Sequence, residues 1–209
     1  MLHKETVAAT TLELLVELQQ KEYLKGFYLV GGTALALKMG HRKSIDLDLF
    51  SNFNFEAGEL LENLSADFPF ELFFSSNNTL KGRIDQIQVD IIAHRYPLIA
   101  TPSVVEQISM LSNEDIIAMK LNAISVSGQR VKDFIDIYYL LGHYSVEDMI
   151  SFYKKKYASY NEVNVLKSLL WFDDVDIEVW PVLIKNPKLK WSAVKIRIEK
   201  AVNMYLKNI

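Results

Sequence analysis

The sequence contains no cysteine among its 209 residues, which excludes disulfide bonds and zinc sites with thiolate ligands and favours a reducing, cytoplasmic setting. No apolar run approaches the roughly 20 residues that cross a bilayer, so we expect no membrane span. A basic start followed by an apolar segment is also missing, so secretion is not expected. Without repeats or low-complexity segments, the length favours one large domain or two small ones with a real core.

The net charge is only −3, so neither sign is in large excess, but the charged residues are unevenly distributed along the chain. Residues 1–150 hold 12 basic and 20 acidic residues, whereas residues 151–209 hold 11 basic and 6 acidic ones. An acidic part followed by a basic part suits an enzyme whose acceptor is a polyanion. Alternatively, Lys154, Lys155, Lys156 and the lysines from 185 onward form only a solvated helical surface.

Nucleophilic triads and histidine metal sites find no support in the sequence. Serine, histidine and aspartate are not arranged with any specificity for such a triad. His41, His94 and His143 lack metal-ligand spacing, so we expect structural or surface roles for them.

A glycine pair, Gly31 and Gly32, follows the apolar run 27–30, which we predict to be a short buried strand. A helix is predicted to begin at Thr33 and to end at Met39. A backbone without Cβ atoms can approach a phosphate closely, and a helix N-terminus directs free N–H groups and partial positive charge toward it. The glycine pair and Thr33 are therefore candidates for binding phosphate.

The next segment, residues 45–50, alternates in polarity and predicts a strand with Ile45 on its apolar face. Asp46 and Asp48 then share the other face, roughly 6 to 7 Å apart. Like charges on one face repel each other unless a cation lies between them, and hard oxygen ligands suit Mg²⁺. A dicarboxylate metal site beside a phosphate-binding turn is the layout needed to bind a nucleoside triphosphate and transfer part of it.

These residues carry a family resemblance. The runs Leu29–Leu35 and His41–Phe50 resemble the DNA polymerase beta-type nucleotidyltransferase signature and, more narrowly, that of the AbiEii toxin family. A second matching block follows in the right order, at Asp115–Leu121 and Arg130–Tyr138. The similarity extends over most of the chain, including 171–174, but recognisable family motifs occur only in these two blocks.

The resemblance implies a metal-dependent nucleotidyltransferase that uses Mg²⁺ or Mn²⁺ and takes a nucleoside triphosphate as co-substrate. It implies an RNA acceptor, in particular a tRNA 3′ end, and the role of toxin in a toxin–antitoxin pair with an antitoxin partner. The residues themselves leave two alternatives open. One is transfer to a small antibiotic or a protein hydroxyl, and the other is a catalytically silent module that binds a nucleotide or partner.

Periodicity and turn signals predict an α+β fold, with a mixed sheet and flanking helices followed by an α-helical half. We expect an α/β catalytic region at 1–96 and a helical region at 97–209 that completes the active site and binds the acceptor. Predicted helices cover 4–24, 56–64, 113–126, 130–141, 145–157, 161–171 and 191–207, and capping boxes are expected at Ser112 with Asp115 and at Ser145 with Asp148. Predicted strands cover 70–74 and 83–92, with a turn at 77–78 and a loop at 97–111.

The third carboxylate of the site is predicted within the strand 83–92. Ile87, Val89 and Ile91 share one face of this strand and leave Asp90 on the other. Asp90 is therefore a candidate metal ligand or base for the attacking hydroxyl. The alternative is an ordinary solvated strand carboxylate, and Asp85 is a weaker choice because its odd offset places it on the opposite face.

The second block places charged residues on two predicted helices. Asp133 and Asp136 lie three residues apart and share a helix face. From the residues alone, Lys132 and Asp136 could form only a surface ion pair, and Lys120 could extend from an apolar helix into water. The resemblance implies instead that Lys120 contacts the triphosphate and that Asp133 lines the active site or acts as the base. It also assigns Arg130, Lys132 and Asp136 to nucleotide binding.

Several further residues have two interpretations. Arg42 and Ser44, just before the dicarboxylate strand, either bind phosphate or hold the loop. The aromatic residues of the C-terminal half could stack on nucleic-acid bases, although core packing is the favoured role. They are Trp171, Phe172, Trp180 and Trp191.

Overall fold

The computed structural model describes residues 1–159 and 161–207, which form two compact units. The first unit comprises Met1–Pro97 and Thr101–Leu111, and the second comprises Leu98–Ala100 and the chain from Ser112 onward. No helix within the described ranges is long and apolar enough to cross a membrane.

A mixed sheet forms the centre of the first unit. Across the described residues it has seven strands in the order β3-β4-β5-β2-β1-β7-β6. Strand β2 runs parallel to β5 and antiparallel to β1, and β1 runs parallel to β7. The strands are β1 (Tyr28–Leu29), β2 (Leu47–Ser51), β3 (Phe70–Ser76), β4 (Thr79–Ile84), β5 (Ile87–Ala93), β6 (Ser103–Val105) and β7 (Ile108–Met110).

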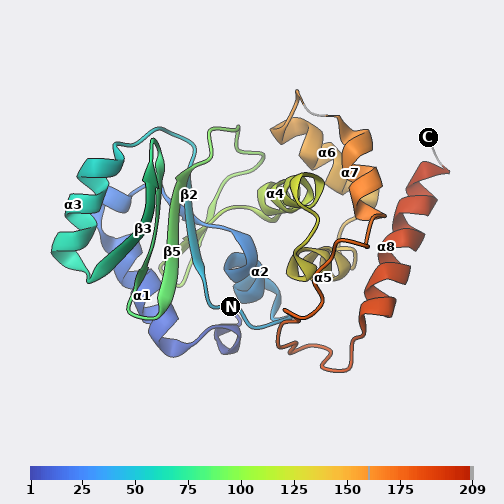
Figure 1. The fold of residues 1–209 in the computed structure, drawn as a ribbon, viewed down its shortest axis with the longest axis horizontal. Helices are drawn as coiled ribbons and strands as arrows, with labels where there is room; N and C mark the ends of the chain where they lie inside the picture. Colours follow the sequence, from blue (N-terminus) through green and yellow to red (C-terminus); the bar gives the residue numbers. More distant parts are fainter. Residues whose placement is uncertain (160, 208–209) are drawn as a thin grey trace. The chain divides into compact units, whose positions relative to one another are not determined.

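Helices flank this sheet. In Figure 1, α3 lies on one side of β3, β5 and β2, and α2 lies on the other. The α-helices of this unit are α1 (Ala9–Gln20), α2 (Gly31–Met39) and α3 (Ala57–Asp67), and two 3₁₀ helices cover Lys4–Thr6 and Glu22–Leu24. The α+β architecture predicted from the sequence is therefore confirmed.

The single helix predicted over 4–24 was wrong, because the chain breaks on both sides of α1. The Thr6 hydroxyl donates to the His3 carbonyl at 2.7 Å and closes a separate turn. Such a local hydrogen bond competes with the helical ladder. At the other end, Lys21 is extended, and the second 3₁₀ helix follows it.

The strand predicted over 83–92 is in fact two strands joined by a tight turn. Ile84 pairs with Ile87, and Asp85 in the turn adopts a left-handed φ of 53°. The loop expected at 97–111 was also wrong for its second half, because β6 and β7 form a hairpin there. Its turn uses Glu106 and Gln107, both with positive φ. Neither turn contains the glycine that normally marks such conformations in a sequence.

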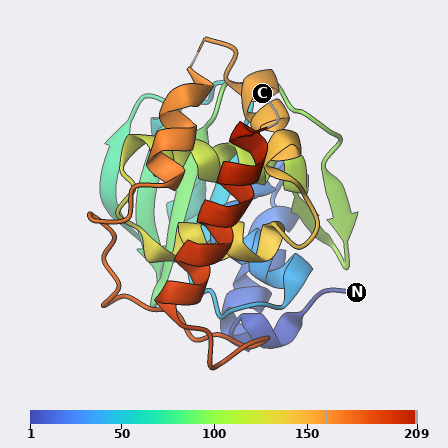
Figure 2. The ribbon, with the colours of Figure 1, turned by 90° about the vertical axis from the view of Figure 1, so that its right-hand side faces the viewer.

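The second unit is helical. Its helices are α4 (Asn113–Val126), α5 (Val131–Leu140), α6 (Val146–Lys156), α7 (Glu162–Leu169) and α8 (Trp191–Leu206). Helix α8 packs against α5, α6 and α7, and Figure 2 shows it in front of them. The predicted N-terminal signals are confirmed, because Ser112 caps α4 and Ser145 forms a capping box with Asp148 on α6.

Candidate active site

The glycine turn brings the start of α2 against the central strand of the sheet. Val30, extended before the helix, donates its N–H to the Asp48 carbonyl at 2.9 Å. Gly31 has a φ of 68°, and a Cβ atom there would lie only 2.6 Å from Asp48 Oδ2. Glycine is needed here both for the backbone conformation and for this close approach. The helix begins at Gly31 rather than at the predicted Thr33.

Helix α2 has no side-chain cap at its N-terminus and no acidic residue in its first turn. The first N–H groups of a helix have no partner within it, and they carry a partial positive charge. A phosphate group can satisfy both the hydrogen bonding and the charge. The turn at Gly31 and Gly32 therefore has the chemistry of a phosphate-binding element next to the Asp48 carboxylate.

The loop between α2 and β2 is held by buried polar contacts. The Arg42 guanidinium lies against the position that a Cβ of Gly32 would occupy, and its Nη1 donates to the Lys43 carbonyl at 3.0 Å. Arg42 is 2% exposed, so its side chain is part of the interior of this loop. These contacts match the loop-holding interpretation of Arg42, and its binding of phosphate stays a prediction.

Thr33 fixes the backbone that carries the first carboxylate. Its buried hydroxyl lies 2.5 Å from the Asp46 carbonyl and 2.8 Å from Ser44 Oγ. The hydroxyl can donate to the carbonyl while it accepts from Ser44. Sequence reasoning assigned Thr33 to phosphate, and its anchoring of the loop could not be read from spacing alone.

The strand with the paired carboxylates begins later than the alternation predicted. Strand β2 starts at Leu47, and Ile45 is 63% exposed, so its predicted place on the apolar face was wrong. Leu47 and Leu49 are fully buried as expected, and Asp48 between them is half-buried on the opposite face. Asp46 lies just before the strand, so the Thr33 contact rather than the pleat determines its backbone position.

Asp90 lies directly beside Asp48. The two residues are paired in register on the parallel strands β2 and β5, so their side chains point to the same face of the sheet. Asp90 is 7% exposed, which contradicts the alternative of a solvated carboxylate. It accepts hydrogen bonds from Lys81 Nζ at 2.8 Å and from Gln88 Nε2 at 3.3 Å. The contact with Lys81 could not be predicted, because it depends on the register between β4 and β5.

The carboxylates on β2 and β5 could provide oxygen ligands for a metal ion. Within residues 1–159 and 161–207, no three histidine, cysteine, aspartate or glutamate side chains form a group that could hold a metal ion. Mg²⁺ usually binds one or two carboxylates and completes its shell with water and substrate phosphates. The neighbouring Asp48 and Asp90 carboxylates suit that kind of site. A shared site that also includes Asp46 stays a prediction.

In the helical unit, Lys120 is enclosed by two carboxylates. Its Nζ lies 2.5 Å from Asp133 Oδ1 and 2.8 Å from Asp136 Oδ2, and all three side chains are buried. The alternative interpretations were wrong, because Lys120 does not extend into water and Asp136 is too buried for a surface pair with Lys132. Arg130 is largely exposed, with Nε 4.0 Å from Asp133 Oδ2. Contact between any of these residues and a nucleotide stays a prediction.

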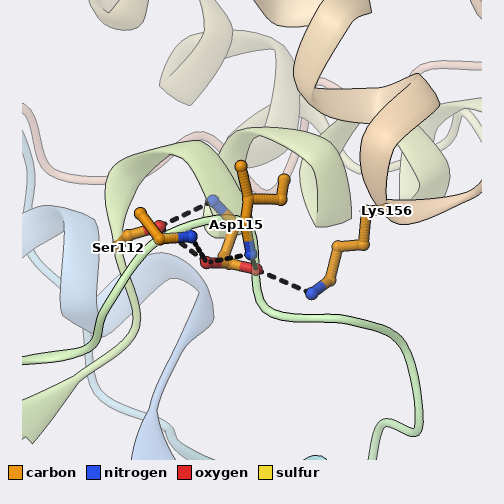
Figure 3. Close-up of polar contacts among 5 residues, drawn as sticks. Ser112, Asp115 and Lys156 are labelled. Carbon is orange, nitrogen blue, oxygen red and sulfur yellow. Dashed lines mark hydrogen bonds and ion pairs between the residues drawn. The ribbon is translucent and has the colours of Figure 1, made fainter.

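Lys156 is buried as well, which corrects its predicted place on a basic surface. Its Nζ lies 2.8 Å from Asp115 Oδ1 (Figure 3). Asp115 also accepts from Ser112 Oγ at 2.7 Å and from the backbone N–H groups of Ile99 and Ala100 at 3.0 and 3.3 Å. Burial raises the pKa of the Asp115 carboxyl, but hydrogen bonds from Lys156, Ser112 and Ile99 outweigh it and hold the pKa below its ordinary value.

The aromatic residues divide into core and surface. Phe172 and Trp191 pack against Phe134, with ring centroids 5.7 and 5.8 Å away, so the core-packing prediction is confirmed for them. Trp171 is 57% exposed, and its indole N–H donates to Asp174 Oδ2 at 2.8 Å. Core packing was therefore the wrong prediction for Trp171.

A known protein family and one relative match most of this sequence. The sequence matches the family described as "Nucleotidyl transferase AbiEii toxin, Type IV TA system" over residues 13–97 and 65–203. An uncharacterised protein of Aquifex aeolicus (strain VF5) is 29% identical over 188 residues, which cover 87% of this chain and 89% of that protein.

Two solved structures share the fold. MenT4, a nucleotidyltransferase toxin from Mycobacterium tuberculosis H37Rv, aligns with a TM-score of 0.66 and 14% identity, over 96% of this chain and 82% of that one. JHP933 from Helicobacter pylori aligns with a TM-score of 0.57 and 19% identity, over 97% and 94% of the two chains. At these identities the likeness concerns the fold alone.

Proposed function

Because the chain belongs to the AbiEii family of nucleotidyltransferase toxins, we propose that it transfers a nucleoside monophosphate from a nucleoside triphosphate to a hydroxyl group of RNA, with Mg²⁺ or Mn²⁺. The observation that carries this proposal is the contact between the glycine turn and the Asp48 carboxylate, with Asp90 in register beside it. Phosphate-binding backbone and metal-binding oxygens then lie side by side, as the reaction requires.

The triphosphate is bound at the start of α2. The backbone N–H groups of the Gly31–Gly32 turn donate to phosphate oxygens, and the helix dipole favours their negative charge. Arg42 and Ser44 hold the loop between α2 and β2, and in the proposed reaction they also face the phosphates. A side chain at Gly31 would close the gap between the turn and Asp48.

The carboxylates provide the metal site. Asp48 and Asp90 would hold the ion through hard oxygen ligands, and Asp46 would join them if its side chain turned towards this pair. When bound, Mg²⁺ or Mn²⁺ neutralises charge on the α-phosphate and on the departing pyrophosphate.

The transfer itself is an in-line displacement. The acceptor hydroxyl oxygen forms a bond to the α-phosphorus, and the bond from that phosphorus to the pyrophosphate oxygen breaks. The hydroxyl proton passes to a carboxylate, either Asp90 or Asp133. In the helical unit, the family resemblance assigns Lys120, Arg130, Lys132 and Asp136 to nucleotide binding, and Lys120 would have to turn away from Asp133 and Asp136 to give its charge to a triphosphate.

Charge supports RNA as the acceptor, since residues 151–209 hold 11 basic and 6 acidic side chains. Lys156 is not available because it is buried with Asp115, but Lys154 and Lys155 are exposed on α6. A tRNA 3′ end is the acceptor that the family resemblance favours, and an antitoxin is the expected protein partner. The proposed setting is the cytoplasm.

A labelling experiment tests the proposal. The purified chain is incubated with each α-labelled triphosphate, Mg²⁺ and total RNA, beside Asp48→Asn and the matched control Asp85→Asn. Asp85 is exposed on the β4–β5 turn, so its variant should behave as wild type. We expect nuclease-sensitive label with wild type and the control but not with Asp48→Asn. Label on protein or on a small molecule would replace RNA as the acceptor, and no transfer to any acceptor would refute the proposal.

A further inference from the structure

Lys81 extends the row of charged residues across the sheet. It lies on β4 directly opposite Asp90 on β5, and Asp90 is directly opposite Asp48 on β2. Directly paired residues on neighbouring strands point to the same face. One face of the sheet therefore carries two carboxylates and an ammonium group, in sequence across three adjacent strands.

The Lys81 ammonium group pairs with one oxygen of the Asp90 carboxylate. Lys81 Nζ lies 2.8 Å from Asp90 Oδ2, and the Lys81 side chain is 42% exposed while that of Asp90 is 9% exposed. The lysine thus reaches the carboxylate from the solvent side and can leave without disturbing the interior. Gln88 approaches the other oxygen at 3.3 Å.

A second ion pair on β4 shows what an ordinary cross-strand pair looks like. Arg83, two residues from Lys81, lies 2.7 Å from Glu71 on β3, but both of these side chains are well exposed. Such surface pairs contribute little. The Lys81 pair differs because its carboxylate is buried and adjoins Asp48.

We propose that Lys81 is the built-in counter-ion of the metal site. Its ammonium group holds Asp90 in place in the absence of a divalent ion and leaves Asp90 when that ion binds. The inference rests on the proposed metal site at Asp48 and Asp90, and it makes Lys81 a positioning residue rather than a catalytic one. Lys81 and the divalent ion compete for the same carboxylate, so removing the lysine charge should tighten binding of the ion.

Binding of Mn²⁺ without nucleotide, followed by electron paramagnetic resonance, tests this competition. To bind, the ion must displace the Lys81 ammonium group from Asp90, and the attraction of two unit charges about 3 Å apart corresponds to about tenfold in affinity even in a water-like dielectric. We therefore expect Lys81→Met to bind Mn²⁺ about tenfold more tightly than wild type. Lys81→Arg, which keeps the charge, should resemble wild type, as should the matched control Arg83→Met.

A double-mutant comparison shows whether the effect passes through Asp90. In an Asp90→Asn background, Lys81→Met should change Mn²⁺ affinity far less than it does in wild type. Three results would overturn the inference. Lys81→Met could bind Mn²⁺ no more tightly than wild type, it could gain as much affinity in the Asp90→Asn background, or no variant could bind Mn²⁺. Nucleotide transfer by wild type and its loss in Asp48→Asn would stand in each case, so the two proposals can fail separately.

Discussion

Replacing Lys156 by methionine should destabilise the helical unit strongly. The substitution leaves the Asp115 carboxylate fully buried without its charged partner. Removing one partner of a buried ion pair costs roughly 3 to 5 kcal/mol. The hydrogen bonds that Asp115 keeps from Ser112, Ile99 and Ala100 place the expected loss near the lower end, at about 3 kcal/mol.

Urea unfolding followed by circular dichroism measures this loss, and a thermal scan should show a fall in Tm of about 6 to 12 °C for a chain of this size. The matched control is Lys155→Met, one residue away and exposed, which should stay within about 0.5 kcal/mol of wild type. The double variant Asp115→Asn/Lys156→Met should recover part of the loss, because no unpaired charge remains buried. Equal stability of the Lys155 and Lys156 variants would refute the reasoning.

The same pair predicts a pH dependence. Hydrogen bonding keeps the pKa of Asp115 below its ordinary value of 3.8 despite burial. A carboxyl with a depressed pKa in the folded state contributes stability that is present above its unfolded pKa and is lost as the pH falls through the folded one. In Lys156→Met, burial dominates and raises the pKa, so the folded state binds a proton at Asp115 before the unfolded state does, and acidification removes the buried unpaired charge. The loss of stability relative to wild type should therefore be largest near neutral pH and should shrink as the pH falls. A stability difference that does not change with pH would contradict this account of the Asp115 site.

Three further changes test the site and the acceptor surface. Gly31→Ala should lower nucleotide transfer at least about tenfold, since the left-handed backbone and the close carboxylate both resist a Cβ, whereas Gly58→Ala, in open space, should not. Thr33→Val should lower transfer while Thr33→Ser restores it, and equal activities in a kinetic assay would remove the hydroxyl from the positioning of the loop. Lys154→Glu with Lys155→Glu should weaken RNA binding and reduce its salt dependence in filter binding, and an unchanged salt slope would mark these lysines as an ordinary solvated surface.

The parts of the fold that local chemistry determines were predictable from the sequence. Ser112 and Ser145 cap α4 and α6 as expected, because a cap needs only residues within one turn. The turn at Asp85 was missed because a non-glycine residue adopts a left-handed conformation there, and the surrounding strands rather than the local sequence select it.

The candidate site was predictable to a similar extent. The glycine turn and Asp48 could be found by motif, and Asp90 could be found by its face on a strand. The positions of Lys81 and Lys156 could not, because each depends on pairing with a residue from another strand or helix. A sequence shows that a lysine is charged, but only the tertiary structure shows whether that lysine forms an ion pair with a buried carboxylate.

Transfer of label from an α-labelled nucleoside triphosphate to RNA by wild type and Asp48→Asn tests the central claim most directly. The account predicts that wild type labels RNA and that Asp48→Asn, folded as judged by an unchanged circular dichroism spectrum, does not. Equal labelling by the two proteins would contradict it, because the carboxylate that contacts the glycine turn would then have no part in the reaction.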